Sequence, residues 1–429
     1  MQPLDYLHAL CLLGVALYLR LREPPRLLLT PLMLIGFFVL YGVGTLIYFN
    51  GADSVQDVRD TVTICLILMW IGLVLGIELA RAAMPTLAMH AERTVRSWAS
   101  EPLLDRAPTN QLLAALGIIV ALFILGMFFG LGKPAEILSF VALESTKEKQ
   151  KFRLELGAQG GYLYLTLLAC VAPFLSFLLL IKGAVTRERY LTGVGLLLAV
   201  AVMAGKVGTF QKIIWLVYLL QLVVAFLAAK RLTFGLGRIL VLLAVLLGGA
   251  VGAALIAFPE MGADRLAEWL AYRFFEVNDE VVYQTFYVYP QHLPHTWGMN
   301  IGLIHNLFGN GELTSSYVQV ANFFGAEGAT FDAFFIADAW VDFSFAGVLL
   351  MAILVGFLVK SVDMYATGLG KTPIAVALIA SGMYGLFELM VTSAFTAFLS
   401  GGLILIPLLV MMSDGLISDL NRGRRQWQR

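Results

Sequence analysis

The residues RLAEWLAYRFFEVNDEVVYQTFYVYPQHLPHTWGMN, numbers 265–300, replace the apolar runs of the rest of the chain with charges, histidines and aromatic rings. They belong to a longer polar stretch, Phe258–Asp332, which separates two groups of apolar runs. Most of those runs are close to the roughly 20 residues that a helix needs to cross a bilayer core. The pattern therefore predicts an all-α polytopic membrane protein with one large loop outside the bilayer.

The composition agrees with a membrane protein. Apolar residues make up 59% of the chain and charged residues 14%, whereas soluble domains carry about 25% charged residues. The net charge is zero, so no basic surface for nucleic acid is expected. Cys11, Cys65 and Cys170 lie inside apolar runs and lack the spacing of a disulfide framework or a zinc site. We expect no metal and no cofactor.

About eleven runs are candidate transmembrane helices, eight before the large loop and three after it. The chain accordingly divides into 1–258 with eight spans, the loop 259–332, and 333–429 with three spans and a tail. The runs are Leu4–Leu19, Leu27–Phe49, Thr61–Leu79, Leu112–Leu131, Tyr162–Ile181, Leu191–Ala204, Phe210–Ala228, Ile239–Phe258, Phe334–Val359, Pro373–Met390 and Phe395–Met412.

Lysine and arginine gather in every second gap between these runs. Arg20, Arg22 and Arg26 follow the first run, and the last run is followed by the basic tail 422–429. Cytoplasmic loops carry this excess of positive charge. The alternation predicts an outside N-terminus, a cytoplasmic C-terminus and an outward-facing large loop. No basic segment precedes the first run, so we expect it to be retained and not cleaved as a signal.

Two further segments near the membrane are expected to be amphipathic or interfacial helices. Within the large loop, Ala263–Gln284 has helical spacing, with apolar residues on one face and acids elsewhere. We expect this helix to lie on the outer surface between spans eight and nine. On the cytoplasmic side, 91–110 is expected to form a connector with Trp98 at the level of the lipid headgroups.

Four cations on the outward side are candidates for binding an anion. Lys206 lies in the predicted short turn Gly205–Thr209, and Lys212 follows it. Glycine and a helix start favour phosphate binding there, while snorkelling of the lysines to headgroups is the alternative. Arg265 and Arg273 are eight residues apart, about two helical turns, so they share one side of the loop helix. Arginine suits phosphate, but pairing with nearby glutamates is the alternative for Arg265.

Acidic residues within or beside apolar runs also require an explanation. Asp338 and Asp342 fall in the outer half of the ninth run and, four residues apart, share one helix face. They predict either the wall of a polar cavity or a solvated helix start. Glu388 near the outer end of the tenth run is a similar case. Asp363 falls in a cytoplasmic gap, where we expect it to be solvated.

The loop also holds candidates for proton transfer and for sugar binding. Histidine titrates near neutral pH as a residue type, so His292, His295 and His305 are candidates to accept a proton. Pro294 disrupts any helical pairing of His292 with His295, which argues against a metal site. Aromatic rings of the loop could stack on sugars or form an interfacial belt; these residues are Tyr283, Tyr287, Tyr289 and Trp297.

The end of the loop adds a resemblance to a known family. Gly328–Asp332 leads into 337–347, ADAWVDFSFAG, and then Leu354-Val355-Gly356. Together with the layout of spans, this segment resembles the O-antigen polymerases, also called oligosaccharide repeat-unit polymerases, which are relatives of the O-antigen ligases. Many of those enzymes have an arginine where this chain has Lys206.

The resemblance implies a metal-independent glycosyltransferase of the bacterial inner membrane. A glycan on undecaprenyl pyrophosphate would be transferred to a sugar hydroxyl of another lipid-linked unit on the periplasmic face. Besides these substrates and membrane lipids, the implied partners are a chain-length regulator and a flippase. The expected catalytic residues are His292, His295, Asp338 and Asp342. The expected substrate-binding residues are Lys206, Lys212, Arg265, Arg273, Tyr283 and Tyr287.

Three other functions are compatible with the sequence. A ligase would transfer finished glycan to a lipid core, and one sequence does not separate it from a polymerase. A polysaccharide or lipid transporter would have internal repeats and interrupted helices, neither of which the sequence predicts. A structural partner in a secretion complex would tolerate loss of the candidate site residues.

Overall fold

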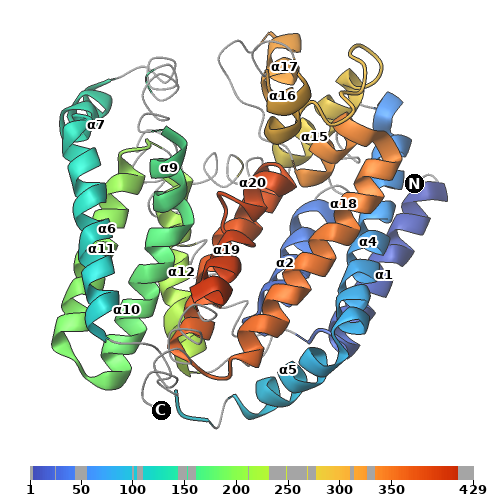
Figure 1. The fold of residues 1–429 in the computed structure, drawn as a ribbon. Helices are drawn as coiled ribbons and strands as arrows, with labels where there is room; N and C mark the ends of the chain where they lie inside the picture. The colour runs from blue at the N-terminus through green and yellow to red at the C-terminus, as the bar shows by residue number, and fades with distance from the viewer. Residues whose placement is uncertain are drawn as a thin grey trace. The chain divides into compact units, whose positions relative to one another are not determined.

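The computed structural model describes most of the chain, and every secondary-structure element in the described part is a helix (Figure 1). The described residues are 3–24, 26–43, 56–98, 101–103, 110–143, 161–210, 212–230, 277–309, 314–325 and 334–413, with the single residues 152, 248 and 268. The predicted all-helical architecture is therefore confirmed for these segments.

Seven helices of the described segments are long and apolar enough to cross a membrane. They are Pro3–Leu21, Val58–Ala83, Asn110–Gly130, Gly161–Thr186, Arg189–Val207, Phe335–Gly368 and Pro373–Val391. Two shorter apolar helices cover Leu29–Gly42 and Ile214–Lys230. A polytopic membrane protein is thus supported, while the count of eleven spans and the sidedness of the chain stay predictions. The eighth predicted span lies outside the described residues.

The chain divides into two compact units that are each assembled from distant segments. Unit 1 comprises Met1–Thr86, Arg231–Ser361 and Leu389–Ala394, and unit 2 comprises Leu87–Lys230, Val362–Glu388 and Phe395–Arg429. Unit 1 holds α1 (Pro3–Leu21), α2 (Leu29–Phe37), η1 (Phe38–Val43), α4 (Gln56–Ala83), α15 (Val277–Val288), α16 (Gly302–Phe308), α17 (Ser316–Phe323) and most of α18 (Phe335–Gly368). Unit 2 holds α6 (Asn110–Gly130), α7 (Lys133–Ala142), α9 (Gly161–Thr166), η3 (Leu167–Val171), α10 (Ala172–Thr186), α11 (Arg189–Val207), α12 (Lys212–Lys230) and α19 (Pro373–Val391). Two more helices are α5 (Pro85–Ser97), mostly in unit 2, and α20 (Ala394–Phe398).

In unit 1, α4 and α18 pack through small residues that recur every four positions (Figure 1). A Cβ at Gly72 would lie 2.8 Å from the Ala352 Cβ, and one at Gly76 would overlap the Ile353 carbonyl. In return, a Cβ at Gly356 would overlap the Leu73 carbonyl. Small residues at this spacing let two helix backbones approach closely, which is a main source of helix association in lipid.

A Gly76→Leu variant is expected to separate α4 from α18 and to yield little monodisperse protein in detergent. The added side chain has to occupy space that the α18 backbone fills, and overpacking of this kind costs about 1–3 kcal/mol or more. Gly14→Leu is the matched control, since a Cβ at Gly14 on α1 meets no atom within 4 Å. Size-exclusion chromatography of both variants measures the effect, and equal yields would contradict the packing described here.

The ninth predicted span is not one continuous helix. In α18, Phe343 (φ −137°) and Ser344 (φ 57°, ψ −148°) leave the helical region and divide the helix into 335–343 and 344–368. The second part is about 37 Å long at 1.5 Å per residue, which exceeds a bilayer core of roughly 30 Å. Asp338 and Asp342 therefore belong to a separate short segment that precedes a helix already long enough to cross.

Three other local expectations are corrected by the structure. The run Phe395–Met412 is interrupted, because α20 ends at Phe398 and helix resumes only at residue 405, after a turn in which Gly402 has φ +80°. Trp98 is fully buried and its indole N–H donates to the Ala228 carbonyl (3.2 Å), so its ring packs inside the protein and is not exposed to lipid headgroups. Asp363 is 2% exposed on α18 and is not solvated.

The helix predicted for 263–284 is only partly described. Residues 263–267 and 269–276 lie outside the described part, and α15 covers Val277–Val288. Val282, Tyr283, Phe286 and Val288 are each 3% exposed or less, and α15 packs against both α4 and α17. The expectation of a helix lying on the surface is therefore wrong for its described part, because side chains on more than one face of α15 are covered by other helices.

Candidate functional site

The centre of the candidate site in unit 1 is the loop 289–300, which is fastened to the first segment of α18 by Asp342. One oxygen of this buried carboxylate, Oδ1, accepts hydrogen bonds from the Thr296 hydroxyl, the Gly298 N–H (3.1 Å) and the Asn300 N–H (3.3 Å). The kink at 343–344 also leaves carbonyls of α18 without a helical partner. Those of Val341 and Asp342 accept the N–H groups of Thr296 (3.0 Å) and Trp297 (3.1 Å).

Asp338 performs a similar task one turn earlier. Its Oδ1 accepts hydrogen bonds from the Ser316 hydroxyl (2.7 Å) and the Asn300 side-chain amide (3.1 Å). The Asn300 Oδ1 accepts the Ser316 N–H (2.9 Å) at the start of α17. The two acids therefore do share one face, as predicted, but that face holds the loop and α17 in place. Their geometry is that of positioning residues, and a catalytic role for either acid stays a prediction.

The loop histidines occupy different environments. The half-buried His295 has Nδ1 3.2 Å from the Val341 carbonyl oxygen, and its ring centroid lies 5.2 Å from that of Trp340. His292 is exposed, with ring centroids of Tyr287 at 4.9 Å and Phe323 at 4.7 Å. His305 lies on α16. Of His292 and His295, His292 is therefore the more accessible to solvent, and a substrate can reach it without displacing the loop.

The predicted sugar-stacking tyrosines separate into buried and accessible members. Tyr283 is 1% exposed, so its ring is covered in this structure, and its role in sugar stacking stays a prediction. Tyr287 is half-buried beside His292, Phe323 and Phe324, and keeps part of its ring accessible.

Tyr289 connects the loop to α17 and α18. Its hydroxyl donates to Gln319 Oε1 (2.9 Å), and its carbonyl accepts the Trp340 indole N–H (2.7 Å). Burial raises the pKa of the Tyr289 phenol to about 12, with a further contribution from the negative charges of Asp338 and Asp342. The phenol therefore stays protonated at neutral pH and acts as a hydrogen-bond donor.

Lys206 is inside unit 2 and not in an exposed turn. It belongs to the last turn of α11, and its side chain is fully buried. The ammonium lies 4.7 Å from the ring centroid of Tyr384 and 5.9 Å from that of Tyr218, and the carboxylate of Glu388 interacts with it electrostatically. Within the described residues, Lys206 Nζ has no hydrogen-bond acceptor. A buried ammonium without acceptors is costly, even beside aromatic rings and one carboxylate.

The interrupted last span packs against η3. A Cβ at Gly402 would be 2.5 Å from the Cβ of Cys170 in η3, and η3 packs against α11, the helix that carries Lys206. The turn at 399–404 thus places irregular backbone against η3. Irregular backbone at membrane depth is tolerated where protein or a cavity surrounds it.

The remaining predicted cations are not located by the described structure. Arg265 and Arg273 lie outside the described residues, and for Lys212 only the backbone position at the start of α12 is described. Their roles stay predictions. The chain segments that were searched contain no group of three His, Cys, Asp or Glu side chains that could hold a metal ion.

Several residues of these sites were not anticipated from the sequence. Thr296, Asn300 and Ser316 are ordinary polar residues of a loop, and nothing in their spacing pairs them with the acids of α18. Tyr384 could have been found, because it precedes Glu388 by four residues and so shares its face of α19.

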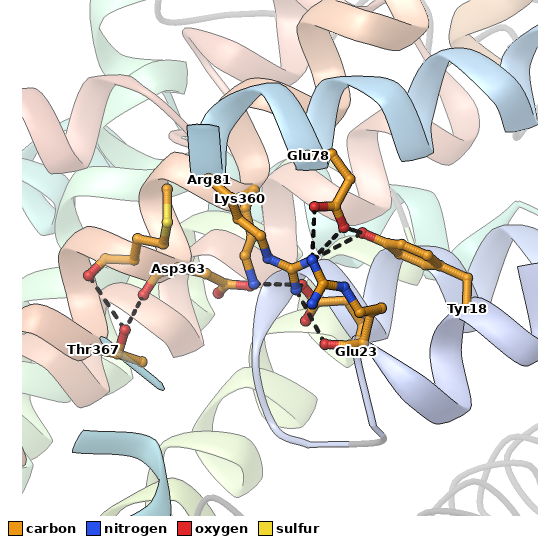
Figure 2. Close-up of polar contacts among 9 residues, drawn as sticks. Tyr18, Glu23, Glu78, Arg81, Lys360, Asp363 and Thr367 are labelled. Carbon is orange, nitrogen blue, oxygen red and sulfur yellow. Dashed lines mark hydrogen bonds and ion pairs between the residues drawn. The ribbon is translucent and has the colours of Figure 1, made fainter. Parts of the chain in front are cut away.

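A second group of charges in unit 1 forms ion pairs between different helices (Figure 2). The Glu23 carboxylate pairs with Arg81 (2.6 Å) and with Lys360. The Glu78 carboxylate pairs with Arg81 and accepts the Tyr18 hydroxyl (2.7 Å). These bonds join α1, α4 and α18 and pair each of Glu23, Glu78, Arg81 and Lys360 with an opposite charge. The group is therefore structural.

Comparison of the chain with models of protein families, with curated proteins and with solved structures returned no match.

Proposed function

We propose that this chain is a glycosyltransferase of the bacterial inner membrane that joins lipid-linked oligosaccharide repeat units. A sugar hydroxyl of one unit attacks the anomeric carbon of a glycan carried by undecaprenyl pyrophosphate on the periplasmic face. The new glycosidic C–O bond forms as the bond to the pyrophosphate oxygen breaks. The hydroxyl proton passes to a base, and the lipid pyrophosphate leaves as an anion.

The observation that carries the proposal is the buried, acceptor-free ammonium of Lys206. A pyrophosphate leaving group requires a fixed positive charge, and exclusion of water strengthens the attraction between such charges. Phosphate oxygens would provide the acceptors that Lys206 lacks among its described neighbours. Because Lys206 is fully buried, a ligand has to displace neighbouring side chains to reach it. Lys212 of the same unit is proposed to add positive charge, and the substrate-binding roles of Arg265 and Arg273 stay predictions.

The residue that accepts the hydroxyl proton stays a prediction; among the loop residues of unit 1, His292 is an exposed histidine and lies against Tyr287. Ring faces of this kind suit the apolar face of a sugar. Asp338 and Asp342 support the reaction by fixing the loop that carries His292, and His295 belongs to the same fastened loop.

The test is an assay of purified protein in liposomes with lipid-linked repeat units, with and without EDTA. We expect polymer in both conditions. Lys206→Ala is expected to lower the rate at least about 100-fold, the usual effect of removing one group that stabilises a developing anion. Arg273→Ala is expected to reduce polymer sharply.

Lys133→Ala is the matched control, because Lys133 is also buried in unit 2 but has Glu136 as a partner (2.8 Å). Polymer formation by Lys206→Ala at the wild-type rate would contradict the proposed role of Lys206 in stabilising the pyrophosphate leaving group. Transfer of glycan to a lipid core, without elongation of lipid-linked units, would identify a ligase instead.

A transporter is the second candidate, and the interruption at 399–404 favours it. Interrupted helices are typical of transport sites in membrane proteins. The same liposomes discriminate the two functions: a transporter moves the lipid-linked unit across the bilayer without lengthening it.

A further inference from the structure

Trp297 is an exposed aromatic side chain on a strained backbone. Its φ is 52°, and the side chain is 70% exposed. Left-handed backbone costs a bulky residue about 1–2 kcal/mol. The strain is held by Asp342, whose carbonyl accepts the Trp297 N–H and whose carboxylate accepts the Gly298 N–H. The backbone of Trp297 is thus held by hydrogen bonds, while its indole side chain is mostly exposed.

The indole lies at the top of an apolar stripe on α18. Trp297 is bonded to the residue that precedes the kink, and a Cβ at Gly298 would lie 3.0 Å from the ring of Phe343. Phe343 and Phe345 are 37% and 39% exposed. Below them along 344–368, three exposed apolar residues recur every four positions and so form one stripe; they are Ala346, Leu350 and Leu354.

The loop that carries Trp297 has no charged side chain of its own, and the nearby Asp342 carboxylate is buried and occupied by hydrogen bonds from that loop. The loop 289–300 contains no lysine, arginine, aspartate or glutamate, and the exposed stripe of α18 is apolar on a helix long enough to cross a bilayer. An exposed apolar stripe of this kind on a membrane-crossing helix is suited to contact with lipid tails. Tryptophan is enriched where lipid tails give way to headgroups, because its ring is apolar and its N–H is polar.

We propose that Trp297, Phe343 and Phe345 form a lipid-contact surface that seats the loop 289–300 in the headgroup region of the membrane. Continuity with the apolar stripe of α18 identifies the occupant as the bilayer itself. The proposal concerns depth in the membrane and does not depend on the chain being a glycosyltransferase. It sets the height of His292 and His295, which lie on the same loop.

The experiment compares a fluorescent label at position 297 with one at position 291. Trp297→Cys and Gln291→Cys are labelled with a nitrobenzoxadiazole dye in liposomes, with wild-type protein as the control for labelling of native cysteines. Gln291 is exposed on the same loop but is polar. We expect the label at 297 to be quenched by lipids with a nitroxide near the headgroup, at least about twofold more strongly than the label at 291. We expect iodide in solution to quench the label at 291 more strongly than the label at 297.

Equal quenching of both labels by iodide, with no effect of the nitroxide lipids at 297, would overturn the proposal and indicate a water-facing ring. Protection of 297 from both quenchers would overturn it in favour of a protein partner. If Trp297→Cys fails to fold, Trp297→Phe in brominated lipids decides the matter. We expect this variant to lose part of the quenchable tryptophan emission, and an unchanged quenched fraction would contradict the lipid contact.

Discussion

Lys371→Met is expected to lower the free energy of unfolding by about 3–5 kcal/mol. The buried Lys371 ammonium donates to the backbone carbonyls of Trp98 (2.9 Å), Glu101 (3.0 Å) and Lys230 (3.1 Å). The ammonium thus donates hydrogen bonds at the C-terminal ends of α5 and α12, where the last carbonyls have no partner within the helix. Methionine fills similar volume but donates nothing, and each buried acceptor left without a donor costs about 1–3 kcal/mol.

The measurement is a titration of unfolding with SDS in mixed micelles. Lys230→Met is the matched control, since that exposed side chain is changed while its carbonyl, the acceptor for Lys371, remains. We expect the control to stay within about 0.5 kcal/mol of wild type, as surface substitutions usually do. A Lys371→Met midpoint equal to that of the control would show that the three hydrogen bonds do not stabilise unit 2.

Asp342→Ala is expected to release the loop 289–300 and to abolish the activity proposed above. The substitution removes the acceptor of three hydrogen bonds and leaves the N–H groups of Gly298 and Asn300 without it. Two or three lost bonds of a charged acceptor correspond to about 3–5 kcal/mol. Hydrogen exchange of 295–300, followed by mass spectrometry, is expected to accelerate by at least about 100-fold.

Asp342→Asn separates a positioning role from a catalytic one. The amide retains an oxygen in the place of Oδ1 and can still accept the three hydrogen bonds, but it cannot act as a base. We expect this variant to keep slow exchange in 295–300 and to retain activity within about tenfold of wild type. An Asn variant with a protected loop and no activity would mean that the carboxylate takes part in the chemistry.

Much of the fold follows from hydrophobic length alone. Runs such as Thr61–Leu79 and Pro373–Met390 correspond to α4 and α19, because a helix in lipid has to satisfy every backbone group internally. The run Phe395–Met412 shows where this reasoning fails. Its apolar composition persists through the turn at 399–404, since backbone that packs against protein does not need to be helical.

The sequence indicated several residues of the candidate site correctly, but it did not indicate the contacts that define the role of each residue. Asp338 and Asp342 stand out because carboxylates are expensive in an apolar run. The sequence could not show that they bond to Asn300, Ser316 and Thr296, since those partners lie between 22 and 46 positions away along the chain. The sequence gives the same reason to expect sugar stacking at Tyr283 and at Tyr287. In the structure the ring of Tyr283 is covered, whereas that of Tyr287 is partly accessible.

The sequence by itself determined that the chain is helical and membrane-embedded, because hydrophobicity and helix length are local properties. Only the tertiary structure decided which charges are paired and which are free to act. Lys206 is unremarkable in the sequence beyond its charge, and its isolation from hydrogen-bond acceptors among the described residues depends on α11, α12 and α19 together. Interaction energies of buried charges depend on distance and on exclusion of water, and both are set by segments that are remote in sequence.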